Sequence, residues 1–102
     1  MKSRYVYLLK STQTGQYKIG VSKNPEVRKK ALETGHGAPL IICHLHYSEY
    51  PFAIEAQLHQ YFEHQRKDGE FFILEPHDIE RFSYLCELYD HCLVKGNEIS
   101  DW

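Results

Sequence analysis

The sequence predicts a small domain of the α/β class, α+β type, in which helices flank an antiparallel three-stranded sheet. Three observations lead to this prediction. Two strand-like segments surround a glycine turn near the N-terminus, an aliphatic segment lies in mid-chain, and three segments have helical periodicity. The chain has 102 residues, the length of one domain, so we expect residues 1–102 to form a single domain.

The first two strands are expected to pair as a hairpin. Residues 5–9 are aromatic, β-branched or aliphatic, and residues 17–21 alternate in character, as strands do. Between them, Gly15 can take the positive φ of a tight turn. Strand alternation places Ile19 on one face of the hairpin and Lys18 on the other.

The first helix is predicted from its boundaries. Asn24 can cap it, Pro25 suits its first position, and Gly35 would end it. Val27 and Ala31 lie four residues apart and mark the face that we expect to pack against the sheet.

The rest of the chain is expected to add one strand and two helices. Residues 40–47 are typical of a third strand. A second helix should begin at Pro51 and end near residue 67, and a last helix should begin at Pro76, with a turn and a short extended piece between the two. The predicted apolar stripe of the second helix is Ile54, Leu58, Tyr61 and Phe62.

The composition points away from a membrane protein. No apolar run approaches the roughly 20 residues that span a bilayer. Residues 1–4 lead directly into a strand rather than into the apolar segment of a signal peptide. The three cysteines lack a close metal-type pair, so free thiols in a reducing compartment are expected. We therefore expect a cytoplasmic protein without a membrane partner.

Charge is unevenly distributed although the net charge is only -2. Residues 1–34 contain eight Lys or Arg against two Glu, whereas residues 75–102 contain two against seven acidic residues. A basic front half and an acidic tail would give a dipolar surface that meets phosphate on one side. A solvated surface with chance clustering is the alternative interpretation.

Four sequence features occur in a characteristic order. Residues 5–7 are Tyr-Val-Tyr and residues 18–20 are Lys-Ile-Gly, on the two strands of the hairpin. Arg28 follows on the first helix, ten residues after that lysine, and Glu55 lies near the start of the second helix. In this order and spacing, about residues 4–74 resemble the GIY-YIG endonuclease superfamily, which has Gly-Ile-Tyr and Tyr-Ile-Gly on those strands.

The second helix and the segment after it resemble one branch of this superfamily. That branch is common in phages and bacterial mobile elements and has Lys-Ile-Gly in place of Tyr-Ile-Gly. The matching residues are Glu55, Leu58, His59, Phe62, Arg66 and the Gly-Glu-Phe-Phe run at 69–72. The last helix and the acidic tail, residues 75–102, lie outside the resemblance.

The resemblance implies a metal-dependent DNA endonuclease that hydrolyses phosphodiester bonds. Glu55 would be the ligand of Mg²⁺ or Mn²⁺, ions that keep most of their waters and take oxygens from phosphate. His59, one turn later on the same helical face, would be a second ligand or a proton-transfer group. Tyr7 would hold the attacking water or the phosphate, and Arg28 would bind two phosphate oxygens.

Two departures from the family pattern leave the general base open. Lys18 stands where the family has its usual basic tyrosine, and lysine is a poor base unless burial or nearby cations lower its pKa. Three possibilities therefore stay open. Tyr7 could take over as the base, Lys18 could act only on the charge of the phosphate, or the catalytic activity could be weak. The family's asparagine beyond the second helix is also missing, and Glu70 in that region is either its substitute or part of a structural motif.

DNA is the expected partner. The residues expected to bind it are Lys23, Lys29, Lys30, His36 and Arg66. A domain this small would need structure-selective binding, a homodimer or a protein partner for specificity. Two other functions stay open: a catalytically weak or inactive nucleic-acid-binding module, and a small phage protein acting through a protein partner by its acidic, aromatic tail.

Overall fold

A computed structural model describes residues 3–100, which form five strands, three α-helices and one 3₁₀ turn. In chain order the elements are β1 (Arg4–Ser11), β2 (Tyr17–Ser22), α1 (Pro25–His36), β3 (Leu40–Ser48), α2 (Pro51–Tyr61), the 3₁₀ turn (Glu63–Gln65), β4 (Arg66–Asp68), β5 (Phe71–Phe72) and α3 (Pro76–Ser100). The predicted order of three strands and three helices is present, and the broad α/β class is confirmed.

The sheet is antiparallel and has the strand order β3-β1-β2-β5-β4. The prediction of three strands was therefore wrong, because β4 and β5 extend the sheet beyond β2. Their connection contains Gly69 at φ 54°, and β5 pairs with β2 by placing Phe71 opposite Lys18. Strands of two or three residues are too short to show the alternation that reveals longer strands.

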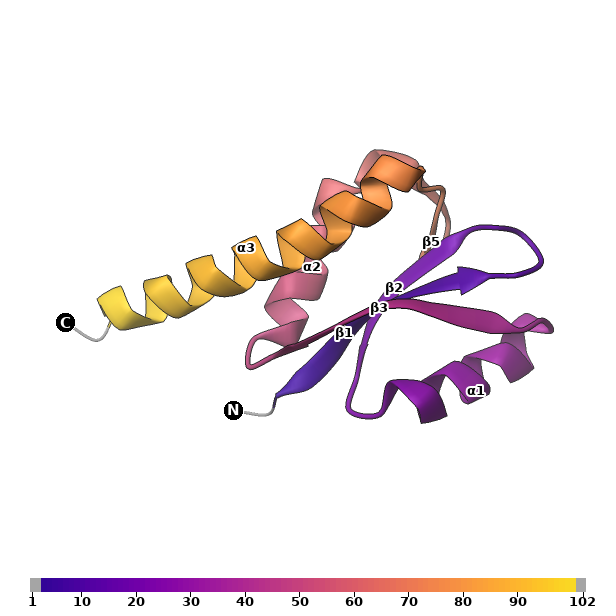
Figure 1. Cartoon of the computed structure of the whole chain (residues 1–102), viewed down its shortest axis with the longest axis horizontal. Coiled ribbons are helices and arrows are strands. Elements are labelled where there is room, and N and C mark those ends of the chain that lie inside the picture. The colour runs from indigo at the N-terminus through magenta and orange to yellow at the C-terminus, as the bar shows by residue number, and fades with distance from the viewer. Residues whose placement is uncertain (1–2, 101–102) are drawn as a thin grey trace.

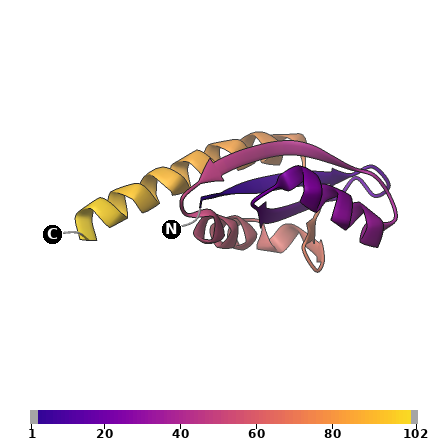
Figure 2. The ribbon, with the colours of Figure 1, turned by 90° about the horizontal axis from the view of Figure 1, so that it is seen from below.

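The domain has three layers. Figure 1 shows α1 on one side of the sheet and α2 with α3 on the other. In Figure 2, α1 lies in front of the strands, and the C-terminal half of α3 extends past the end of the sheet. The two faces of β1 therefore pack against different helices, as the alternation of a strand requires.

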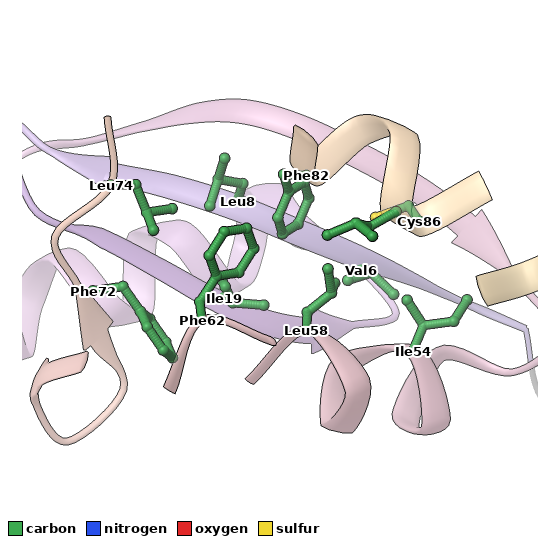
Figure 3. Close-up of a cluster of buried hydrophobic side chains, with 11 residues drawn as sticks. Val6, Leu8, Ile19, Ile54, Leu58, Phe62, Phe72, Leu74, Phe82 and Cys86 are labelled. Atoms are coloured by element: carbon green, nitrogen blue, oxygen red, sulfur yellow. The ribbon is translucent and has the colours of Figure 1, made fainter. Parts of the chain in front are cut away.

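The main core fills the space between the sheet and the layer of α2 and α3 (Figure 3). Its fully buried members from the strands and α2 include Val6, Leu8, Ile19, Ile54 and Leu58. Those from the segments after α2 include Phe62, Phe72, Phe82 and Cys86. Because α2 is fixed to β2 by this packing, the next face of α2 lies along the edge of β2. The candidate site forms there.

The boundaries of α1 follow the predicted signals at its start but not at its end. Asn24 accepts a hydrogen bond from the backbone N–H of Val27 at 3.3 Å, and Pro25 occupies the first turn. The helix passes through Gly35 and ends at His36, where Gly37 takes φ 79° as the C-cap.

The predicted inner face of α1 was wrong. The Val27 side chain is 63% exposed, and Ala31 is exposed as well. Leu32 is the α1 side chain that packs against the sheet, where a second, smaller core contains Tyr7, Leu9 and Leu40 with Ile42 beside them. With so few apolar residues on α1, the four-residue spacing of Val27 and Ala31 was not a reliable sign of burial.

α3 is tied to β3 by polar contacts. Asp90 accepts a hydrogen bond from the Ser48 hydroxyl at 3.0 Å and contacts His46 Nε2 at 2.9 Å. The helix begins at Pro76, as predicted, and continues to Ser100. Within residues 3–100, every helix is too short or too polar to cross a membrane.

The packing of α2 can be tested by comparing a buried and an exposed apolar residue. We expect Leu58→Ala to lower the free energy of unfolding by about 2–5 kcal/mol, because it leaves a cavity between α2 and β2. Val27→Ala should change it by no more than about 0.5 kcal/mol, because that side chain faces solvent. Urea denaturation measures both, and equal costs would contradict this packing.

Candidate active site

The site is organised around the cross-strand pair of Tyr7 on β1 and Gly20 on β2. The phenol ring lies directly over the glycine: a Cβ at Gly20 would be 2.3 Å from the Tyr7 hydroxyl oxygen and 2.4 Å from Cζ. Only a residue without a side chain leaves this space. Tyr7 is 2% exposed, so the glycine of the Lys-Ile-Gly run fixes where the hydroxyl points.

Lys18 lies two residues before Gly20 on the same face of β2 and is 7% exposed. Its ammonium forms an ion pair with the carboxylate of Glu70, which directly precedes β5. It also lies 5.3 Å from the ring centroid of Phe71. The hydrogen bond from Lys18 lowers the pKa of Glu70. Lys18 is therefore a nearly buried strand lysine with an ion-pair partner, and not a solvent-exposed one.

Arg28 reaches the site from α1, where it is exposed. Its guanidinium lies close enough to the Tyr7 hydroxyl to act on the pKa of that phenol as a hydrogen-bond donor and as a positive charge. Burial raises the pKa of Tyr7 above its ordinary 10.0, and the hydrogen bond and charge of Arg28 act in the opposite direction. Tyr7 is thus a neutral phenol near pH 7, with its oxygen held against a cation.

Glu55 and His59 reach the site from α2. His59 donates a hydrogen bond from Nε2 to the carbonyl oxygen of Ile19 at 3.0 Å, and Arg66 approaches its Nδ1 at 3.5 Å. A carbonyl can only accept, so the proton must be on Nε2. Both ring nitrogens are thereby engaged, and the imidazole joins α2 to β2 while it lies 4.0 Å from the Glu55 carboxylate.

The Glu55 carboxylate faces both acidic and basic groups. Burial raises its pKa, His59 opposes this, Glu70 adds to it, and Lys18 opposes it. These influences, with those on Tyr7, place Glu55 within electrostatic reach of the other site residues. The structure therefore brings five side chains from five separate segments within electrostatic reach of one another: Tyr7, Lys18, Arg28, Glu55 and Glu70.

The donor set suits one hard cation that is mostly coordinated by other oxygens. Among residues 3–96, no three His, Cys, Asp or Glu side chains are grouped to enclose a metal. Mg²⁺ needs only one or two protein carboxylates because water and substrate phosphate complete its octahedron. Glu55, with Glu70 nearby, fits that requirement. A cation would stabilise the ionised form of Glu55, which is disfavoured mainly by burial and to a smaller extent by the charge of Glu70.

The residues expected to bind nucleic acid fall into two groups. Lys23 and Lys30 are exposed, whereas Lys29 forms an ion pair with Glu33 at 3.3 Å. His36 contacts the Ser11 hydroxyl at 2.7 Å, and its ring stacks on Phe71. Each of these residues lies on α1 or just before it.

Arg66 is half-buried, and its guanidinium is engaged by other groups of the domain. It forms an ion pair with Glu63 at 2.9 Å, donates to the carbonyl oxygen of Gly69, and contacts His59. Its guanidinium also lies over the Phe72 ring, 4.9 Å from the centroid. These contacts support the β4–β5 hairpin and the imidazole of His59.

Sequence reasoning overlooked the role of Gly20 and left the role of Glu70 open. Glu70 was expected to be either a substitute for the family's asparagine or part of a structural motif, and in the structure its carboxylate forms an ion pair with Lys18. The signal was available: a buried lysine on β2 needs a counter-charge, and the nearest acidic residue before a strand-like Phe-Phe pair is Glu70. What the sequence could not provide was the pairing of β5 with β2.

Residues 4–86 match the model described as the T5orf172 domain. The chain belongs to the T5orf172 family. T5orf172 domains are phage-associated and nuclease-like, and the match spans all five strands, α1, α2 and the first part of α3. No curated protein and no solved structure gives a significant match.

The Tyr7–Gly20 contact yields a direct test in this T5orf172 domain. Gly20→Ala should destabilise the protein by about 1–3 kcal/mol, because the methyl group overlaps the phenol ring and forces it to move. Gly35→Ala is the matched control, since a Cβ there meets nothing within 4 Å. Replacing a helical glycine should leave stability unchanged or raise it by up to about 1 kcal/mol. Denaturant titration of both variants measures the difference, and equal effects would contradict the close contact.

The two site carboxylates should affect stability in opposite directions. The pKa of Glu55 is raised from 4.5, so its ionised form costs stability once the pH rises above that value, and Glu55→Gln should raise the Tm near pH 7. The pKa of Glu70 is lowered from 4.5, so it stabilises above that value and loses this effect as the pH falls through its folded pKa. Glu70→Gln should therefore lower the Tm near pH 7.

Thermal unfolding in metal-free buffer, from pH 3 to pH 8, measures this pair of effects. Both differences from wild type should shrink toward the acidic end, where both carboxyl groups are protonated in the folded and unfolded states. Shifts in the same direction near pH 7 would show that the charge balance of the site has been misjudged.

Proposed function

We propose that this T5orf172 domain is a metal-dependent DNA endonuclease that hydrolyses phosphodiester bonds. The observation that supports the proposal most is the meeting of Tyr7, Lys18, Arg28 and Glu55 at the edge of β2. Hydrolysis of a phosphodiester needs a cation that binds the phosphate oxygens, a ligand for the metal ion and a proton acceptor for the attacking water. These four side chains provide each of those groups.

In the proposed reaction, Arg28 binds the scissile phosphate. It is exposed on α1, and a guanidinium can donate to two phosphate oxygens at once. Lys18 adds a second positive charge from the floor of the site, where Glu70 holds it in place. As negative charge builds on the phosphoryl oxygens, these cations stabilise it in a partly buried environment.

Glu55 is the proposed metal ligand and Tyr7 the proposed base. A Mg²⁺ or Mn²⁺ ion, when bound, would stabilise the developing charge and lower the pKa of a coordinated water. To act as the base, Tyr7 first loses its own proton to solvent, and the charge of Arg28 favours the resulting phenolate. The phenolate then accepts a proton from the attacking water and returns to the neutral phenol. Lys18 is less suited to this role because its ammonium is committed to Glu70.

His59 is the proposed positioning residue. Its nitrogens are engaged by Ile19 and Arg66, so it acts by holding α2 against β2 and by keeping the Glu55 carboxylate at the edge of that strand. We therefore propose that His59 sets the orientation of the metal ligand rather than binding the metal itself.

One observation favours a second candidate function, a nucleic-acid-binding module without catalysis. Lys18 replaces the usual tyrosine and its charge is offset by Glu70, which leaves the supply of a base to Tyr7 alone. Such a module would bind DNA in a salt-dependent manner through Arg28 and Lys29, without a metal.

The specificity of either the endonuclease or the binding module would come from DNA structure, a second copy or a protein partner. Free thiols at Cys43, Cys86 and Cys92 are compatible with action in the cytoplasm.

Nicking of supercoiled plasmid tests the proposal. Wild type should nick with Mg²⁺ or Mn²⁺ and not with EDTA, and Glu55→Gln should abolish nicking. Arg28→Ala should lower the rate about 10²–10³-fold, the usual cost of one charge-stabilising donor. Glu80→Gln, at an exposed position on α3, is the matched control and should nick like wild type.

Two outcomes would reject the endonuclease. One is the absence of nicking by wild type with every metal tested, and the other is equal nicking by wild type and Glu55→Gln. Metal-independent, salt-sensitive binding that is lost in Arg28→Ala, together with no nicking, would establish the binding module instead.

A further inference from the structure

A hollow of about 280 Å³ lies beside the candidate active site. One wall is the C-terminal half of α1, with Ala31, Leu32 and Gly35, and Leu40 at the start of β3 adds further apolar surface. Lys18 lines it too, so the hollow and the active site share a residue. Ligand pockets are usually about 300–1,000 Å³, and this one is large enough for one flat ring system.

The hollow is also lined by two aromatic rings, those of His36 at the end of α1 and Phe71 on β5. The rings of His36 and Phe71 stack at a centroid distance of 5.2 Å and an interplanar angle of 26°. The Ser11 hydroxyl contacts His36 Nε2 at 2.7 Å, and the Lys18 ammonium lies 5.3 Å from the Phe71 centroid. A preformed aromatic surface of this kind loses little conformational entropy when a ligand stacks on it.

Gly35 opens the helical wall. It lies in the last turn of α1, and a Cβ built there meets no atom within 4 Å. Glycine inside a helix weakens it relative to alanine, and neither a positive φ nor a close backbone contact requires glycine here. The effect of the missing side chain is to leave space facing the hollow.

We propose that this hollow binds one nucleobase that has left the base stack, from the nucleotide next to the scissile phosphate. The inference rests on the proposed function, because Lys18 connects the hollow to the phosphate site. A base offers a flat ring for the aromatic wall and the apolar helix face, and its nucleotide brings the anionic phosphate that Lys18 and Arg28 attract. Proteins commonly hold unstacked bases between aromatic and apolar side chains in this way.

The proposal explains how the domain would select its substrate. Extruding a paired base costs unpairing and unstacking energy, and that cost is lowest for a mismatched or single-stranded base. The domain should therefore prefer DNA with an unpaired nucleotide beside the cut over continuous duplex. Stacking accepts any base, so the preference should concern DNA structure more than sequence.

The test fills the hollow from the helix. Gly35→Phe would occupy it, and Gly35→Ala is the matched control because it adds a single methyl group in open space. In a Glu55→Gln background, which prevents cutting, binding to an oligonucleotide with one unpaired 2-aminopurine is measured by fluorescence anisotropy and by the probe's emission. Gly35→Phe should weaken binding about 10-fold and abolish the emission change, whereas Gly35→Ala should do neither.

An abasic scan identifies the contacted position. Removing the base at one position beside the cut should weaken binding of the control by about 10-fold, and the same removal should have no further effect on Gly35→Phe. A flat scan, or equal behaviour of the two Gly35 variants, would overturn the proposal. If circular dichroism shows that Gly35→Phe is misfolded, Ala31→Leu fills the same hollow from an exposed helical position and the same outcomes apply.

The binding readouts separate this inference from the proposed function. If the wild-type protein nicks plasmid but the abasic scan is flat, the endonuclease proposal stands and the base-binding site is rejected. A protein that never nicks, but shows the base-dependent signal and its loss in Gly35→Phe, keeps the base site and rejects the nuclease.

Discussion

The contact between the Tyr7 ring and the bare backbone of Gly20 is the constraint on which the site depends. Because the ring lies over β2, its hydroxyl meets Arg28 from α1 and comes within electrostatic reach of Glu55 from α2 and Glu70 before β5. Arg28 and Glu55, which come from helices on opposite sides of the sheet, thus both act on the phenol of Tyr7. A small shift of that ring would change the geometry of each of them at once, which is how a single glycine on a strand can control a site assembled from distant segments.

The charges around this phenol are balanced unevenly. Lys18 and Glu70 neutralise each other, whereas Glu55 is partly buried without an ion-pair partner as close. A carboxylate in that condition is costly for folding and favourable for binding a cation, because the ion stabilises the charge that burial disfavours. Proteins often keep such local destabilisation at functional sites. A stability gain in Glu55→Gln with a loss of nicking would be the expected signature of this compromise.

Much of the fold was readable from the sequence, and what was missed has a physical cause. The hairpin of β1 and β2, the cap at Asn24 and the starts of α2 and α3 depend on local signals that survive without tertiary context. The burial of Val27 was predicted wrongly because one apolar pair does not define a face. The short extended piece after the second helix was expected, but its pairing with β2 was not, because two residues have no period. The meeting of Tyr7, Arg28 and Glu55 was expected from family resemblance, not from local pattern, and their roles stay predictions.

The β4–β5 hairpin links these observations. Three consecutive residues, Glu70 and the two residues of β5, serve three different parts of the domain. Glu70 gives Lys18 its counter-charge, Phe71 forms the aromatic wall of the hollow, and Phe72 is fully buried in the main core. The burial of Lys18 therefore depends on this hairpin: without Glu70, a nearly buried ammonium would be unpaired, which is costly. Because Phe72 anchors the hairpin in the core, the charge of the site and the shape of the hollow are fixed by the same packing contact. A buried lysine on β2 is thus a property of this whole end of the sheet, and not of one side chain.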